Sequence, residues 1–174
     1  AATVNKVLPF TSYDSLKPED LWAYMGGYEK DTGGSVLSIP HNSNLSFDSD
    51  GTLKTLMFPP LDSNGKPLTQ DYGYLRSRWE PLAEATQIKG DSETHPLLSP
   101  NDEFGDYETW NTWGGRVNGA MYNGNSYIRP DSWLPHQYMR SALKLGLQQK
   151  AKTGANPFKF GMIGSTDSHT ALTS

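Results

Sequence analysis

The feature that most constrains the fold is an apolar run near the end of the chain that gives way abruptly to polar residues. The run covers residues 158–163 and contains Phe158, Phe160, Met162 and Ile163. A nearly continuous apolar run is typical of a strand in a parallel sheet that is covered on both faces. In α/β proteins, ligands and catalytic groups collect at the carboxyl ends of such strands. The sequence therefore predicts an α/β fold with a candidate site just after residue 163.

An aspartate and a histidine follow this run at a spacing of two. Asp167 and His169 would point to the same side of an extended segment. A carboxylate oxygen and an imidazole nitrogen can then converge on one metal ion or one substrate group. The alternative is an aspartate that caps the backbone beside a histidine on the surface.

The rest of the chain alternates between helical and extended patterns. Helices are predicted at residues 18–32, 68–79, 100–110 and 138–150, and strands at residues 35–40, 81–88 and 158–163. Each predicted strand is followed by polar residues. Repeated helix–strand units of this kind favour parallel α/β architecture, and both a doubly wound sheet and part of a barrel fit the pattern.

Composition limits both the organisation and the chemistry. A chain of 174 residues with 35% hydrophobic content fits one domain, residues 1–174. The net charge of −4 and the lack of a basic stripe argue against a nucleic-acid partner. No cysteine is present, so disulfides, thiolate zinc sites and a cysteine nucleophile are excluded. Any metal or catalytic site must use His, Asp, Glu or hydroxyl groups.

No run approaches the ~18 apolar residues of a membrane span, and residues 1–5 lack the features of a signal peptide. We therefore expect a soluble protein without a membrane partner, whose compartment the sequence leaves undetermined.

Two further segments contain candidate functional residues. Asp91, Glu93 and His95 alternate, so in an extended segment they would share a side, as metal ligands or acid and base partners do. A solvated loop is the alternative. Residues 112–135 are rich in Gly, Asn and aromatic residues, which predicts a long loop. Such a loop is either a lid that contacts substrate or a tightly packed structural loop.

Residues 46–57 match part of the calcium-loop pattern. Asp48, Asp50 and Gly51 have the required spacing. However, Ser46 stands at the position of the first ligand, and Met57 stands at the position of the bidentate carboxylate. The segment therefore fails as a calcium loop.

Three motifs together resemble a known family. They are IPHNSN at residues 39–44, EPLAEATQIKGDSETHPLLSPNDEF at residues 80–104, and NPFKFGMIGSTDSHT at residues 156–170. They look like a large bacterial family of domains of unknown function, which is similar to the PHP (polymerase and histidinol phosphatase) metal-dependent hydrolases. The resemblance implies a distorted, TIM-barrel-like (β/α)7 barrel, in which divalent metals (Mn, Zn or Fe) activate water against phosphate esters.

The resemblance assigns roles to particular residues. His41 resembles a metal-binding histidine that follows a proline, and Asp167 and His169 resemble the closing metal-binding pair. Glu84, Glu93 and His95 are the catalytic candidates near the pocket. Glu84 would orient a ligand or substrate.

The departures from the family pattern matter as much as the match. The earlier His-x-His pair and the bridging Glu are missing, and the four histidines at positions 41, 95, 136 and 169 cannot supply them. The chain therefore resembles the middle-to-later part of a longer protein, and its first residues suggest a trimmed start. A partial barrel with unpaired edges would associate with itself, so we expect a homo-oligomer.

These observations favour part of a metal-dependent hydrolase that acts on a small-molecule ester, with metal-bound water as nucleophile and the isolated chain inactive. The alternative is a noncatalytic binding or scaffold domain whose loop at residues 112–135 binds a sugar or peptide. A serine hydrolase is disfavoured, because Ser165 lacks a glycine-flanked elbow.

Overall fold

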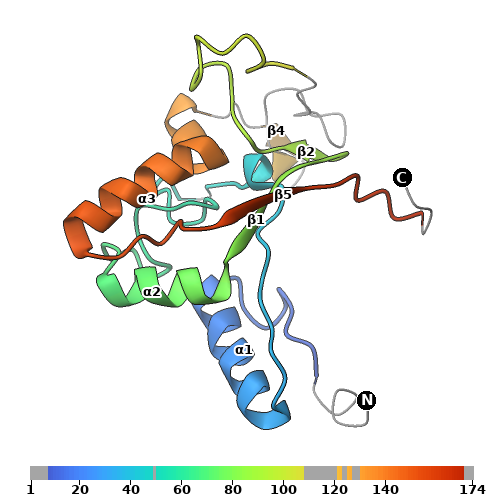
Figure 1. Cartoon of the computed structure of the whole chain (residues 1–174), viewed down its shortest axis with the longest axis vertical. Helices are drawn as coiled ribbons and strands as arrows, with labels where there is room; N and C mark the ends of the chain where they lie inside the picture. Colours follow the sequence, from blue (N-terminus) through green and yellow to red (C-terminus); the bar gives the residue numbers. More distant parts are fainter. Residues whose placement is uncertain (1–7, 49, 108–120, 123–124, 127–129, 171–174) are drawn as a thin grey trace.

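A computed structural model describes residues 8–48, 50–107, 121–122, 125–126 and 130–170. Figure 1 shows helices α2 and α3 at the left of the view, α1 below them, and a small sheet at the centre. The helices are α1 (Pro18–Thr32), η2 (Ser43–Leu45), α2 (Gln70–Trp79), η3 (Asp131–His136) and α3 (Met139–Thr153). The strands are β1 (Leu82–Gln87), β2 (Gly90–Asp91), β3 (Met121–Tyr122), β4 (Asn125–Ser126) and β5 (Gly161–Gly164).

The main sheet has three strands in the order β2-β1-β5. β5 runs parallel to the central strand β1, with Leu82 opposite Gly161, whereas β2 pairs antiparallel to β1. β3 and β4 form a separate two-stranded ladder. The expected TIM-barrel-like (β/α)7 barrel is therefore wrong for the described residues, which form a small, open, mixed sheet.

Two misassigned strands explain much of this error. Residues 35–40 are extended but form no strand. Two backbone hydrogen bonds hold them: Ser38 N donates to Trp79 O over 2.8 Å, and Glu84 N donates to Pro40 O over 2.9 Å. Pro40 has no N–H with which to continue a ladder. A few single hydrogen bonds hold this segment in place of a paired strand.

The apolar run at residues 158–163 also differs from its predicted role. Phe158 is buried, but the strand begins only at Gly161, and Met162 and Ile163 are 49% and 41% exposed. Strand β5 lies at the edge of an open sheet, and all four of its residues are exposed, so neither of its faces is fully covered. An apolar run alone cannot distinguish a covered strand from an edge strand, because both favour the same residues.

Three predicted helices are present. α1 has Pro18 at its start and Gly33 at its end, where φ is 69°, a left-handed conformation that favours glycine. In α2, the side chain of Thr69 accepts a hydrogen bond from Tyr72 N and so caps the helix. α3 ends at Gly154 with φ 90°. The helix expected at residues 100–110 is wrong within the described part, since residues 101–107 form turns.

The core lies where the helices meet β1 and the loop before α2. Its large side chains come from α1, α2, α3, the loop at residue 58 and the segment before β5, and they are Trp22, Met25, Phe58, Tyr72, Trp79, Met139 and Phe158. Each fully buried side chain of this size stabilises the fold by about 1.5–3 kcal/mol.

A buried arginine belongs to the same core. Arg76 and Glu80 are 3% and 8% exposed, and Arg76 Nε donates to Glu80 Oε2 over 2.9 Å. Tyr72, Leu75 and Trp79 lie three and four positions apart, a spacing that predicts one buried helical face. Tyr72 and Trp79 are indeed buried, but Leu75 is 43% exposed and Arg76 is buried in its place.

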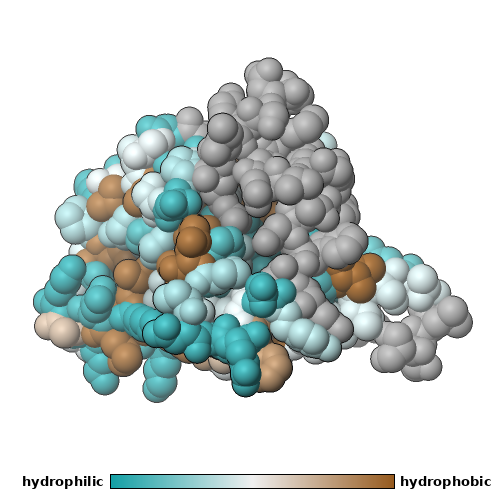
Figure 2. Space-filling view, turned by 90° about the horizontal axis from the view of Figure 1, so that it is seen from above, coloured by the Kyte–Doolittle hydropathy of each residue, from teal (hydrophilic) through white to brown (hydrophobic). Residues whose placement is uncertain are grey.

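On the face seen in Figure 2, hydrophobic residues lie among hydrophilic ones and do not gather over a single element. Among the described helices, none combines the length and apolar character that a membrane crossing requires.

Candidate functional site

The candidate site lies at the turn between β1 and β2, residues 88–89. β1 and the segment after β5 stay joined there, because Ser165 N donates to Thr86 O and Ile88 N donates to Thr166 O, each at 3.2 Å. The next residue of the turn, Lys89, then meets the polar residues that follow β5. The parallel pairing of β1 and β5 thus brings residues 78 positions apart into contact.

Asp167, His169 and Lys89 form one polar cluster. His169 Nε2 lies 2.6 Å from Asp167 Oδ1. Lys89 Nζ donates to the other carboxylate oxygen of Asp167 and, over 2.9 Å, to its backbone carbonyl, and it lies 3.4 Å from His169 Nε2. The ammonium group is thus held by the carboxylate and the backbone carbonyl of Asp167, and His169 donates to the same carboxylate.

The same contacts control the charge of the carboxylate. The hydrogen bond from Lys89, aided by His169, lowers the pKa of Asp167 below its ordinary value. Asp167 is therefore ionised at neutral pH, and this anion is what holds Lys89 and His169 together. The cluster lies near the surface, with the His169 side chain 74% exposed.

The backbone around these residues has an unusual conformation. Asp167 and His169 have φ of 48° and 57°, and Asn42, next to His41, has φ of 50°. Only a few per cent of residues other than glycine adopt this left-handed region, although Asn, Asp and His do so more readily than most. Such conformations cluster at functional sites. Three of the four non-glycine positions with positive φ in the described chain thus fall on the predicted site or beside it.

His41 reaches the same end of the sheet by another route. Its neighbour Pro40 accepts the hydrogen bond from Glu84 N, and the side chain of Asn42 packs against Gly90. His41 itself is exposed. Among the residues that the structure describes, no three His, Asp or Glu side chains are arranged to hold a metal ion.

Glu84 lies on β1 opposite Ile163 of β5 and is partly buried. Its Oε2 accepts a hydrogen bond from Gln87 Nε2 over 3.3 Å. Glu84 therefore sits beside the strand that leads to Asp167, but its carboxylate has a partner within β1.

Glu93 and His95 have different neighbours. Arg140 of α3 donates from Nε and Nη2 to Glu93 Oε1, at 3.0 and 2.6 Å, and from Nη1 to Asp102 at 2.5 Å. His95 packs its ring against Tyr138, with 5.5 Å between the centroids, and its Nδ1 accepts from Leu97 N. Arg140 thus links Glu93 to the loop at residue 102, and the predicted acid and base pairing of Glu93 with His95 stays a prediction.

Asp91, the first of the three alternating residues, is half-buried at the end of β2. Burial raises the pKa of its carboxyl group above the ordinary value, and nearby Glu93 adds to the effect. One oxygen of Asp91 accepts a hydrogen bond from Glu93 N. This bond turns the backbone, so the segment is not the extended run that the alternation assumed.

Sequence reasoning missed a buried polar cluster beneath His41. Asn44 Oδ1 accepts from Ser92 Oγ over 2.9 Å, and Ser43 Oγ donates to the backbone carbonyl of Gln137 over 2.6 Å. Asn42 Oδ1 and Gln137 Oε1 are buried without a hydrogen-bond partner among the described residues. The repeated asparagines after His41 were the signal in the sequence, but only the fold brings Ser92 and Gln137 to them.

The fourth histidine, His136, forms hydrogen bonds with the backbone of the loop at residue 58. His136 Nδ1 donates to Phe58 O over 2.8 Å, and Phe58 N donates back to His136 O over 2.9 Å. Burial lowers the pKa of His136. The predicted loop at residues 112–135 lies largely outside the described residues, which include only 121–122, 125–126 and 130–135 of it.

Comparison with protein-family models finds a match over residues 1–174 to a family described as Protein of unknown function (DUF3604). Neither the comparison with curated proteins nor the comparison with solved structures finds a match.

Proposed function

We propose that this chain, which belongs to the family described as Protein of unknown function (DUF3604), supplies the ligand pair Asp167 and His169 to a metal-dependent hydrolase. The family description assigns no activity, so the hydrolase and its small-molecule ester substrate are our proposal. The observation that supports it best is the cluster after β5. There the Asp167 carboxylate contacts both a cation, the ammonium of Lys89, and the imidazole of His169.

The donor types suit the metals that we expect. Carboxylate oxygen and imidazole nitrogen are common ligands of zinc, manganese and iron. A metal-bound water has a lowered pKa, which is the chemistry that a complete centre would supply.

The described residues do not fit a complete centre. Catalytic zinc uses three protein ligands, whereas Asp167 and His169 are two, and His41 joins no group of three among the residues described. We therefore assign no catalytic step to this chain alone and expect it to be inactive by itself. Glu84, Glu93 and His95 keep their proposed roles as residues near the substrate.

Metal binding tests this proposal. Mn²⁺ broadens NMR signals of nearby nuclei, so even weak binding is measurable. We expect selective broadening at Asp167 and His169, which His169→Ala removes. Lys89→Met should strengthen binding, because the ammonium no longer competes for the same position. Ser168→Ala, between the two ligands, is the matched control and should bind as the parent protein does.

Two results would contradict the proposal. One is broadening that is uniform along the chain or absent in both the parent protein and Lys89→Met. The other is unchanged binding in His169→Ala.

A noncatalytic binding domain is the second candidate. The loop proposed for it lies mostly outside the described residues, but a different feature favours a binding role. This feature is a cavity beside α1 and α2.

A further inference from the structure

A second candidate binding feature lies away from the Asp167 cluster. A cavity of about 690 Å³ opens between residues 10–18, the loop at residues 46–59 and the side of α2 that carries Tyr72 and Arg76. Of the described residues, its lining includes neither Asp167 nor His169. Pockets that hold small organic molecules usually measure about 300–1,000 Å³ and combine apolar walls with a few polar groups.

The walls of the cavity are mostly apolar and include the aromatic rings of Phe10, Phe47 and Tyr72. Phe10 packs against Tyr24 with 5.3 Å between ring centroids, and Phe47 meets Trp133 edge-on at 5.2 Å. Leu21 of α1 contributes to the opposite wall. A ligand with an aromatic or other flat apolar body would replace water on these surfaces at little cost.

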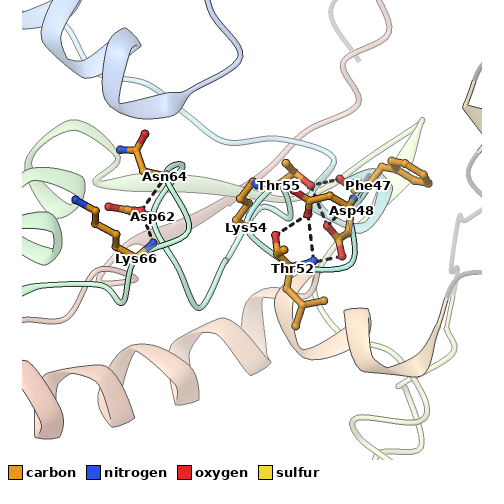
Figure 3. Close-up of polar contacts among 10 residues, drawn as sticks. Phe47, Asp48, Thr52, Lys54, Thr55, Asp62, Asn64 and Lys66 are labelled. Carbon is orange, nitrogen blue, oxygen red and sulfur yellow. Dashed lines mark hydrogen bonds and ion pairs between the residues drawn. The ribbon is translucent and has the colours of Figure 1, made fainter.

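The loop at residues 46–59 forms one wall of the cavity, and hydrogen bonds to its own residue Asp48 hold it in place. Figure 3 shows the buried carboxylate of Asp48 turned toward its own loop. Asp48 accepts hydrogen bonds from Leu53 N over 3.1 Å and from Thr55 Oγ1 over 3.4 Å. The neighbouring loop is closed in a similar way, since Asp62 accepts from Asn64 N and Lys66 N at 2.9 and 2.8 Å. These bonds fix the backbone beside Phe47, Thr55 and Ser63, which line the cavity.

The polar end of the cavity is built by Arg76, Tyr72 and Glu80. Arg76 donates from Nε to Glu80, from Nη1 to Tyr72 Oη over 3.4 Å and from Nη2 to Met57 O over 2.8 Å. A guanidinium group has five N–H donors, so the second hydrogens of Nη1 and Nη2 have no partner among the described residues. Arg76 is also fixed against the ring of Phe158, 4.9 Å from its centroid. A preorganised donor with spare hydrogens is suited to an acceptor oxygen.

The charges around the cavity limit the charge of the ligand. Arg76 is paired with Glu80, and Lys54 is paired with Asp50. Lys17 donates to the neutral amide of Asn64 over 3.2 Å, so its charge is not compensated by that contact. A multiply charged molecule such as a nucleotide would need several unpaired cations. The cavity therefore suits a neutral or singly negative ligand.

From these observations we propose that the cavity binds a small molecule with an apolar, ring-containing body and one carbonyl or carboxylate oxygen, which accepts from Arg76. This site does not depend on the proposed metal site. The two can therefore succeed or fail separately.

Three related probes test the proposal, measured by calorimetry and ligand-observed NMR. Indole acetate and indole acetamide carry the acceptor oxygen, and indole has the same body without it. We expect the two substituted probes to bind the full chain about tenfold more tightly than indole, as an added hydrogen bond to a charged group would give. Equal affinity of acetate and acetamide supports a neutral ligand, and tighter binding of the acetate supports a singly negative one.

Variants locate the binding. Leu21→Trp should fill the cavity and weaken all three probes, whereas Leu147→Trp, on the exposed face of α3, should leave them unchanged. Arg76→Lys should remove the advantage of the substituted probes over indole, provided that circular dichroism shows the fold intact. If Arg76→Lys does not fold, Leu21→Trp alone decides. The proposal is overturned if no probe binds, if indole binds as tightly as the other two, or if Leu21→Trp binds as the parent protein does.

Discussion

Arg76 and Glu80 form an ion pair inside the core, with 2.9 Å between Nε and Oε2 and side chains only 4% and 9% exposed. Trp22 Nε1 donates to the other oxygen of Glu80 over 3.0 Å, so both carboxylate oxygens have partners. Burial by itself would lower the pKa of Arg76, but Glu80 and Tyr72 outweigh it and the net shift is upward. The pair thus ties α1, α2 and the loop at Met57 to one another.

Removing one member of this pair should destabilise the protein strongly. Glu80→Gln leaves the charge of Arg76 buried and uncompensated, which we expect to cost about 3–5 kcal/mol in the free energy of unfolding. The matched control is Glu29→Gln, which breaks the pair with Arg78, whose side chain is 54% exposed. An exposed pair contributes about 0–1 kcal/mol. Urea unfolding measures both, and similar losses for the two variants would contradict the prediction.

His136 should make stability depend on pH. Its folded-state pKa lies below the ordinary value of 6.5 because of burial, so the unfolded chain binds a proton more readily. The stability that neutral His136 provides is therefore complete above about pH 6.5 and is lost as the pH falls through the lower, folded-state pKa. We expect the free energy of unfolding to fall as the pH is lowered from about 6.5 through the folded-state pKa of His136. His136→Asn keeps a donor for Phe58 O and should reduce this slope, whereas an unchanged slope would assign it to other groups.

Two glycines in helices should respond oppositely to alanine. At Gly146 of α3 an added Cβ would lie 2.1 Å from Asn156 Oδ1, the atom that accepts from Phe158 N. Gly146→Ala must therefore displace Asn156, and we expect a lower melting temperature. At exposed Gly27 of α1 an added Cβ meets nothing within 4 Å, so Gly27→Ala should stabilise by roughly 0.5–1 kcal/mol through helix propensity. Thermal unfolding of both variants checks the signs.

The edge of the sheet should support self-association. β5 is the end strand in the order β2-β1-β5, so its outer edge has no partner strand within the described chain. Exposed Met162 and Ile163 lie on it. We expect a homo-oligomer in sedimentation experiments at micromolar concentration and a shift toward monomer in Ile163→Lys, because charged residues block edge pairing. Leu147→Lys, at a position that is also exposed but lies on α3, should not shift it. A monomeric parent protein would refute this expectation.

Local signals predicted the local structure well. Pro18 with the acids after it and the paired glycines at residues 33–34 placed both ends of α1, and the apolar stripe with Gly154 placed α3. The run of small and apolar residues around the single acid Glu84 predicted β1. These features depend on neighbouring residues in sequence, whose caps and propensities act without the rest of the fold.

The candidate site was predictable only in part. The Asp-x-His spacing pointed to Asp167 and His169, and the structure brings their side chains to 2.6 Å. The prediction assumed an extended segment. Both residues instead have positive φ, so their side chains meet in a different backbone conformation. Their ligand roles and those of His41, Glu84, Glu93 and His95 stay predictions. Nothing in the local pattern indicated that Lys89 would join the cluster.

The sequence by itself determined the positions of α1, α2 and α3, the absence of cysteine chemistry, and which polar residues follow β5. Only the tertiary structure decided that the sheet is small and open, that Arg76 is buried with Glu80, and that Lys89 meets Asp167. Burial and pairing depend on which segments meet across long sequence separations, and a single Arg or an apolar run is compatible with several such arrangements. The Arg76 and Glu80 pair illustrates this, because its i,i+4 spacing is common on exposed helices and becomes a core feature only when Trp22, Met57 and Phe158 close around it.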